Sequence, residues 1–458
     1  MLRGDFRRAL LALLLLAVTA CTGGSADSAR PSAASATPGE IVVASGRDVT
    51  GKNGIRQQLI DTWNRQQEKA GTGYHARLVE LPGSADEQRS QLLGALQSGS
   101  ARYDVVNLDV TWVPEFAEAG LIRPLADDAV DADVIPSVAR TARWDDHVYA
   151  VPFNSDVGLL YYRRDYLAEV GRTDLGGDVT WQELRELVNS LDREEPGRRY
   201  EEGWTTQLAA YEGRTVNAIE AFASATPDFA LTGADGHYDG DVQQLTDGIA
   251  ELRRRTDSSY TLDDAFGSEE TASLGDFADG RTAFLRHWPY AYRTLHQTFT
   301  ADQLGVAPLP GRAVLGGQNL AVTRSTQRYD GAAALIAFLT DADSQRCLLD
   351  AGFAATRTSV YATDVTCTNA RVSTTPAPSA TGESADRMPR DRAGRPAYAT
   401  DILLKALRQA VSRPRTPLYG AFTQTLTTEL GPLFGEAPPT DSRLAERLDE
   451  ALRKALPD

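Results

Sequence analysis

Residues 103–125 read YDVVNLDVTWVPEFAEAGLIRPL, and this stretch is the clearest sign of the fold. Its first six residues form a short, mostly apolar run that is typical of a buried strand. Asp109 follows directly, and ligands of open α/β sheets bind beyond the carboxyl ends of the strands. Asp109 is therefore a candidate ligand-binding residue. Its alternative role is to cap the helix that begins near Val113, since Asp favours such positions.

The residues before this strand alternate between strand-like and helical patterns. Strands are predicted over 41–44 and 76–81, and helices over 55–67 and 87–96. This β-α-β-α-β order predicts a mostly parallel sheet with helices on both faces. A second α/β stretch runs from about 153 to 305 and includes an amphipathic helix over 181–191. Two α/β lobes of this size predict a binding cleft between them.

The N-terminus indicates export. Three arginines precede the apolar run 9–20, which is too short to span a bilayer and has the form of a secretion signal. The run ends in VTAC, which resembles a bacterial lipobox, in which Cys21 is acylated and the chain is cut before it. A generic signal with a chance cysteine is the alternative. Residues 22–39 are small and polar, as in a flexible tether. The protein is therefore expected on the outer face of the cell membrane, held by lipid.

Composition excludes several functional classes. The chain has 458 residues, enough for two or three domains, with 42% hydrophobic and 24% charged residues, as in soluble globular proteins. A net charge of −16 argues against nucleic-acid binding. Three cysteines and five histidines exclude a disulfide scaffold and most Cys/His metal sites, and no cofactor is expected. Cys347 and Cys367 are a candidate disulfide, because an exported protein can keep one.

One motif is misleading. Residues 46–53 (GRDVTGKN) match seven of the eight positions of a P-loop, but Asn53 stands where a Ser or Thr hydroxyl should bind Mg²⁺. An exported protein also meets no ATP pool, so we reject nucleotide binding. A Gly-rich loop before a helix can instead present backbone N–H groups to a polar ligand. The usual metalloprotease, EF-hand and serine-nucleophile motifs are missing.

Four further stretches complete a series of motifs. They are YAVPFNSDVGLLYYRRDYLAEVG (149–171, with TWQEL at 180–184), FADGRTAFLRHWPY (277–290), APLPGRAVLGGQNLAV (307–322) and TRTSVY (356–361). With residues 103–125, in this order, they resemble family 1 of the extracellular solute-binding proteins of carbohydrate ABC importers. The likeness is greatest to the trehalose/maltose-binding lipoproteins of actinobacteria, which also have a segment similar to AVSRPRTPLY (410–419). It spans about residues 40–455 apart from the 370–395 loop.

This resemblance implies a hinged, two-lobed α/β receptor of the type II periplasmic-binding-protein-like fold, with the ligand cleft between its lobes. The first lobe would be 40–152 plus 308–355 and the second 153–307 plus 356–458, with 370–395 a disordered loop. The resemblance implies a monomer that is no enzyme. It would capture a disaccharide of the trehalose or maltose type and deliver it to permease subunits, which work with a cytoplasmic ATPase.

The resemblance also implies the ligand-binding residues. They are Asp109, Asn154, Asp156, Glu270, Trp288, Tyr290, Gly317, Gln318, Arg357 and Arg413. Acidic side chains and arginines suit sugar hydroxyls, and an indole can stack on the apolar face of a pyranose. The trehalose-binding subgroup tends to carry Asn at the position of Asp156, and the wider family often has Trp at that of Gln318. These departures leave the disaccharide open.

Several candidates have a structural alternative. Asp156 also suits a turn, Trp288 a packed core, the glycine pair 316–317 a turn, and Glu270, Arg357 and Arg413 the surface. Two other functions also stay open. One is a receptor of this fold for another oligosaccharide or a glycerophosphodiester. The other is a glycoside hydrolase, although no pair of carboxylates with separated pKa values is evident.

Overall fold

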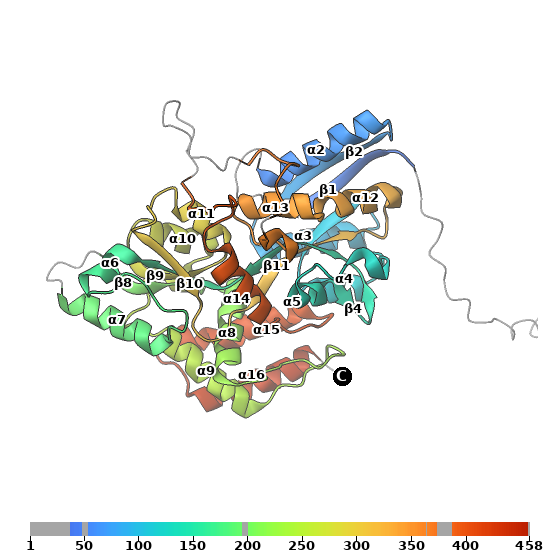
Figure 1. Cartoon of the computed structure of the whole chain (residues 1–458). Coiled ribbons are helices and arrows are strands. Elements are labelled where there is room, and N and C mark those ends of the chain that lie inside the picture. Colours follow the sequence, from blue (N-terminus) through green and yellow to red (C-terminus); the bar gives the residue numbers. More distant parts are fainter. Residues whose placement is uncertain (1–36, 48–53, 195–199, 363, 373–386, 457–458) are drawn as a thin grey trace, which may run out of the picture.

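The computed structural model describes residues 37–47, 54–194, 200–362, 364–372 and 387–456 (Figure 1). The predicted signal peptide, Cys21 and most of the predicted tether lie outside the described residues, as does most of the P-loop-like segment. Within the described ranges, no helix has both the length and the apolar character needed to cross a bilayer.

The first sheet has five strands in the order β2-β1-β3-β11-β6. Their bounds are β1 Gly39–Gly46, β2 Tyr74–Leu81, β3 Val105–Asp109, β6 Val151–Val157 and β11 Leu315–Val322. β1 pairs in parallel with β2 and β3, as the β-α-β-α-β pattern predicts. β11 is antiparallel to both β3 and β6, so β6 runs in the same direction as β1, β2 and β3. The sheet is mostly parallel, as predicted, with β11 as the exception. β6 and β11 lie next to the two points where the chain passes between the sheets, and they are not part of a β-α-β unit.

The second sheet has four strands in the order β10-β7-β9-β8. Their bounds are β7 Leu159–Arg163, β8 Glu202–Thr205, β9 Thr282–His287 and β10 Leu304–Pro308. β7 is antiparallel to β10 and β9, and β8 is parallel to β9. A small hairpin, β4 Arg143–Trp144 with β5 His147–Val148, stands apart from both sheets.

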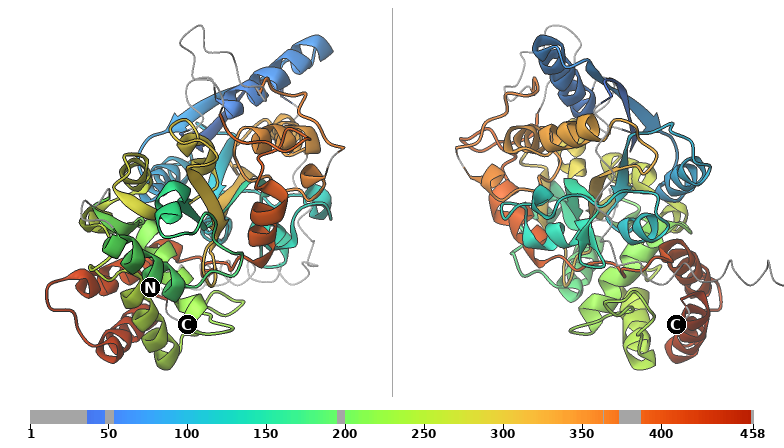
Figure 2. Two further views of the ribbon diagram at one scale, coloured as in Figure 1. Left: turned by 60° about the vertical axis from the view of Figure 1, so that its left-hand side comes forward. Right: turned by 90° about the vertical axis from the view of Figure 1, so that its right-hand side faces the viewer.

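Helices cover both faces of the first sheet (Figure 1). On one face, apolar side chains of β1 and β3 pack against α2 Ile55–Ala70, α12 Tyr329–Leu339 and α13 Ala342–Asp350. On the other face lie α3 Ala85–Gln97 and α4 Val113–Glu118. The apolar cluster of this second face continues into α8 Glu212–Ala225, α9 Val242–Arg255, α15 Tyr419–Leu430 and α16 Asp441–Ala455, which lie together in Figure 2.

The second sheet is covered in the same way. One face packs against α6 Arg164–Glu169 and α7 Trp181–Glu194. The other packs against a group of short helices: α5 Pro136–Ala139, α10 Glu270–Ala278, α11 Tyr290–Leu295 and α14 Leu404–Gln409. Each sheet therefore has its own buried core, as two lobes require.

The chain changes sheets at two neighbouring points. Gly158 is the single residue between β6 and β7, and its N–H donates to the carbonyl of Val314, which lies on the return from β10 to β11 (3.4 Å). A Cβ at Gly158 would lie 2.3 Å from an oxygen of Glu220, so only glycine fits. The predicted boundaries between the lobes, after residue 152 and before residue 308, lie a few residues earlier. The predicted residue ranges of the lobes stay a prediction.

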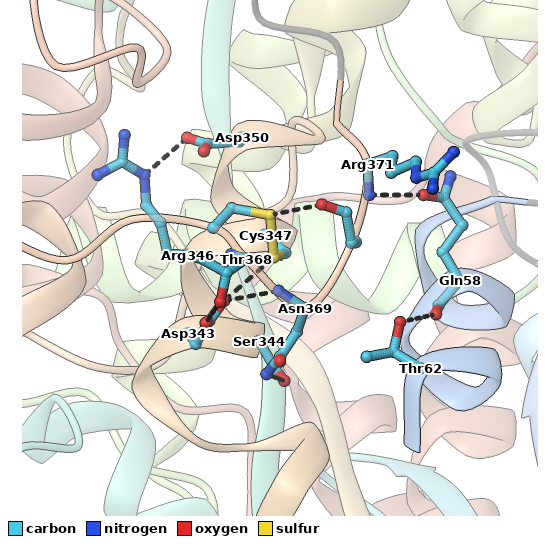
Figure 3. Close-up of a disulfide and its surroundings, with 12 residues drawn as sticks. Gln58, Thr62, Asp343, Ser344, Arg346, Cys347, Asp350, Thr368, Asn369 and Arg371 are labelled. Atoms are coloured by element: carbon cyan, nitrogen blue, oxygen red, sulfur yellow. Dashed lines mark hydrogen bonds and ion pairs between the residues drawn. A yellow bond between two sulfur atoms is a disulfide. The ribbon is translucent and has the colours of Figure 1, made fainter. Parts of the chain in front are cut away.

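A disulfide joins Cys347 of α13 to Cys367 (Figure 3), with the Cα atoms 4.7 Å apart. The residues after Cys367 lie on α13 and α2: the Asn369 N–H donates to Asp343 (3.0 Å), and that of Arg371 to Gln58 (3.1 Å). The predicted disordered loop over 370–395 is therefore wrong for residues 370–372 and 387–395, which are held by hydrogen bonds. Residues 373–386 lie outside the described part of the chain.

We expect the double variant Cys347→Ala/Cys367→Ala to lower the free energy of unfolding by about 3 kcal/mol, because the bond closes a loop of about 20 residues in the unfolded chain. Urea titrations followed by circular dichroism measure this change. A reducing agent should lower the midpoint of the wild type and leave that of the variant unchanged. Equal midpoints of variant and oxidised wild type would show that the bond adds no stability.

Candidate functional site

One face of the first sheet is apolar along most of its length and polar at one end. Ile41, Val43 and Val105 of this face are buried under α2 and α12. Beyond them, at the carboxyl ends of β1 and β3, come Ser45, Asn107 and Asp109. Residues two apart on a strand share a face, so these polar residues continue the apolar rows. On the neighbouring strands, Gln318 lies opposite both Asp109 and Asn154.

Arg56 holds this polar end together, and it is not among the residues predicted from the sequence. Its guanidinium donates to Ser45 Oγ and the Gly46 carbonyl (2.9 Å each), to Gln318 Oε1 (2.8 Å) and to Asn154 Oδ1 (3.3 Å). The side chain is buried. A signal was present: an arginine at the start of the apolar stripe 56, 59, 60 and 63 of α2, where a hydrophobic residue is usual.

Asp109 forms an ion pair with Arg413. The two side chains meet at 2.9 Å, and the other end of the guanidinium binds Glu212, at the start of α8, at 2.5 Å. Val411 pairs with Val314 beside the crossover, which brings Arg413 to this place. Burial raises the pKa of Glu212, and the positive charge of Arg413 opposes the rise. Asp109 does not cap α4, but it accepts hydrogen bonds from the backbone and hydroxyl of Thr111.

Asp156 is the least satisfied acid of the site. Its Oδ2 accepts one long hydrogen bond from Asn154 (3.4 Å), whereas its buried Oδ1 has no partner among the described residues. Burial raises the pKa of Asp156 to about 7. The charge of Asp109 adds to this rise, while Arg56, Arg286 and Arg413 oppose it. The carboxyl is therefore largely protonated below neutral pH in the absence of ligand.

Trp288 and Glu270 form a second wall. The indole N–H donates to Glu270 Oε1 (3.3 Å), and the Tyr211 hydroxyl donates to Glu270 Oε2 (2.9 Å). The guanidinium of Arg286 lies 3.9 Å from the centre of the indole. A Cβ at Gly316 would lie 3.1 Å from both the indole and Asp156 Cβ, so this glycine lets the two walls approach. Tyr290 is half-buried, edge-on to His287.

Two sequence candidates have a different explanation. Gly317 has φ of 116°, and a Cβ there would lie 2.4 Å from the Asn154 carbonyl, so close strand packing explains the glycine. Arg357 binds Asp131 (2.9 Å), Asp133 (3.4 Å) and the Thr340 carbonyl (2.6 Å), and none of these belongs to the site. Asp131 and Asp133 neutralise the charge of Arg357, and both lie outside the two walls of the site. We therefore leave Arg357 out of the candidate site.

The pKa of Asp156 predicts a pH-dependent stability. Between pH 4 and 7 the folded chain binds this proton and the unfolded chain does not, so stability falls as pH rises through this window. Asp156→Asn removes the effect. We expect the variant to match the wild type near pH 4 and to exceed it at pH 8, by at most about 4 kcal/mol. Urea unfolding at both pH values measures the difference.

Glu446→Gln on α16 is the matched control, because Glu446 is exposed and the substitution also removes one carboxylate. We expect it to change the free energy of unfolding little at either pH. A constant difference between Asp156→Asn and the wild type at all pH values would contradict the assignment.

Removing the shared cation should be costly. Arg413→Met leaves Asp109 and Glu212 facing each other without compensation, and we expect a loss of about 3–5 kcal/mol of stability. Adding Glu212→Gln should recover part of it. Arg447→Met, which breaks an exposed pair with Glu429, should cost less than about 1 kcal/mol. Chemical unfolding of the four proteins tests this, and equal losses in the two arginine variants would refute it.

Comparison with known proteins identifies the family of the chain. Residues 64–374 match the family described as bacterial extracellular solute-binding protein. A probable ABC transporter-binding protein of Deinococcus radiodurans is 26% identical over 307 residues, which are 62% of this chain and 68% of that protein. The sn-glycerol-3-phosphate-binding periplasmic protein UgpB of Yersinia enterocolitica is 26% identical over 288 residues, 56% of this chain and 62% of that protein. The matches thus span about two thirds of the relatives' lengths.

Solved structures confirm the predicted fold class. Maltose-bound MalE3 of T. maritima superposes with a TM-score of 0.73 at 22% identity, covering 91% of this chain and 99% of that one. UgpB of Mycobacterium tuberculosis in complex with glycerophosphocholine superposes with a TM-score of 0.68 at 19% identity, covering 92% and 99%. The chain has their two-lobed α/β fold, and by its match over residues 64–374 it belongs to the bacterial extracellular solute-binding protein family.

Proposed function

We propose that this protein is the substrate-binding component of an ABC sugar importer and captures a disaccharide of the trehalose or maltose type. The observation that carries the proposal is the meeting of two unlike walls at Gly316. One is the polar end of the first sheet, and the other is the indole of Trp288 with Glu270. Lipid attachment at Cys21 and delivery to a permease with a cytoplasmic ATPase belong to the same proposal.

The two walls suit the two kinds of surface that a sugar presents. Asp109 and Asp156 accept hydrogen bonds from hydroxyl groups, and the half-buried Trp288 offers an aromatic surface to the C–H groups of a pyranose. A wrong epimer leaves buried polar groups unpaired, at a cost of about 1–3 kcal/mol each. The site can therefore select among sugars that differ at one hydroxyl.

Closure of the lobes provides the signal to the permease. Two interactions tie the first sheet and α3 to segments that are distant in sequence: the ion pair between Asp109 and Arg413, and the hydrogen bond from the Glu212 N–H to Asp86 (3.3 Å). A ligand between the walls adds contacts that exist only when the lobes are closed. It therefore shifts the population toward the closed shape, which the permease can recognise.

A second candidate ligand is a glycerophosphodiester, favoured by the match to UgpB proteins. The charges of the site argue against it. Arg413 is the cation nearest to Asp109, and both Asp109 and Glu212 already neutralise it. A phosphate would have to displace these carboxylates or lie beside them. A neutral sugar meets no such repulsion.

A thermal-shift screen against trehalose, maltose, longer maltodextrins and glycerophosphocholine tests the proposal. A ligand that binds only the folded state raises the melting temperature, and at 100 times its Kd it adds about 2.7 kcal/mol. We expect a rise of a few degrees with trehalose or maltose. The rise should disappear in Asp109→Ala and Trp288→Ala, which remove one group from each wall.

Arg357→Ala is the matched control. This variant loses the bonds to Asp131 and Asp133 but leaves both walls intact, so the ligand-induced rise should persist. A rise with glycerophosphocholine alone would favour the second candidate. No rise with any sugar would refute the proposed function.

A further inference from the structure

Two buried oxygens of the candidate site have no hydrogen-bond donor within reach among the described residues. They are Asp156 Oδ1 and Asn107 Oδ1. Asn107 is 3% exposed, and its amide nitrogen binds Ser45 and Gln318, so its oxygen also belongs to the polar end of the sheet. One donor, Arg413 Nε, is likewise unpartnered. An unpaired buried polar group costs about 1–3 kcal/mol, so a ligand that supplies donors gains most here.

Negative charge also exceeds positive charge at the site. Asp109 and Glu212 share the single cation Arg413, and Arg286 is matched by the buried Glu220. Arg56, which binds neutral groups of the polar end, is the third cation among the described residues of the site. Three further acids, Asp86, Asp156 and Glu270, still leave an excess of carboxyl groups. Glu270 accepts from two neutral donors, Tyr211 and Trp288.

Asp86 adds to this excess. Burial raises its pKa, and the charges of Asp109 and Glu270 raise it further, although Arg89 and the bond from the Glu212 N–H oppose this. Asp86, Asp156 and Glu270 thus lie in one negative field, and no ion pair between any of them and a cation is found in the described part of the chain.

The acids are not arranged as a metal cage. Among the described residues, a single group of His, Cys, Asp and Glu brings three ligand atoms close enough to share an ion: Asp343, Cys347 and Cys367. The two cysteines of that group form the disulfide. The acids of the site are spread over two walls and do not cluster around one point. This arrangement suits a cationic group that is part of a larger organic molecule better than a bare metal ion.

We propose that the preferred ligand is a cationic sugar, with an ammonium group in place of one hydroxyl, held between Asp156 and Glu270 beside Trp288. This inference rests on the proposed function and names the class of sugar. An ammonium group brings three donors and no acceptor, which matches the unpaired oxygens. The indole of Trp288 donates a hydrogen bond to Glu270, and Gly316 separates the indole from Asp156. One sugar ring beside Trp288 can therefore reach both acids. Aromatic rings also attract cations, as the position of Arg286 over this indole illustrates.

Isothermal titration calorimetry at pH 7, where about half of the Asp156 carboxyl groups are ionised, tests the proposal with matched ligands. The probes are trehalose, maltose and their analogues with an amino group at carbon 2, 3, 4 or 6 of one ring. We expect at least one amino analogue to bind at least tenfold more tightly than its parent, or about 1.4 kcal/mol. This ratio should fall severalfold in Glu270→Gln and in Asp156→Asn. It should stay unchanged in Glu446→Gln, which removes one exposed charge from α16.

Each other outcome overturns the proposal in a distinguishable way. If the parent sugars bind and no amino analogue binds more tightly, the inference fails and the proposed function stands. If the advantage falls equally in Glu270→Gln and Glu446→Gln, the net charge of the protein explains it. If no sugar, neutral or charged, produces heat, the inference and the proposed function fail together.

Discussion

The buried ion pair between Arg286 and Glu220 is the interaction on which the rest of the structure depends. The two side chains are almost fully buried and meet at 2.7 Å. Glu220 also accepts the N–H of Val314 and lies against Gly158, so it touches both points where the chain changes sheets. Arg286 in turn lies over the indole of Trp288. Breaking such a pair leaves one charge uncompensated, which costs several kcal/mol.

The polar part of the site begins where helix α2 no longer covers the first sheet. Helix α2 buries the apolar part of one face and, through Arg56, binds the polar residues that begin where its cover stops. The second wall comes from the end of β9 and the start of α10. Rigid elements thus supply almost every functional group, which suits a site that must distinguish hydroxyl positions.

Much of this arrangement could be predicted from the sequence, because local patterns carry it. The strand before Asp109 placed this residue at a strand end, and the motif 277–290 singled out Trp288, which follows β9. Glu212, Tyr211 and Asn107 were missed, since their roles depend on partners more than 50 residues away or on neighbouring strands. Arg357 was misassigned for the same reason: nothing local indicates that Asp131 lies beside it. Antiparallel β11 was missed because strand direction depends on the route of the chain.

The single residue between β6 and β7 has a mechanical consequence. With only Gly158 as a link, and with its N–H bonded to the return strand at Val314, the two sheets have almost no slack between them. Any rotation of one sheet against the other must pivot close to this point. Trp288 lies close to this point, because Arg286 contacts its indole and the partner of Arg286, Glu220, lies against Gly158. The link between the two sheets and the aromatic face of Trp288 therefore share one region of the molecule, so a ligand bound on that face lies beside the axis between the sheets.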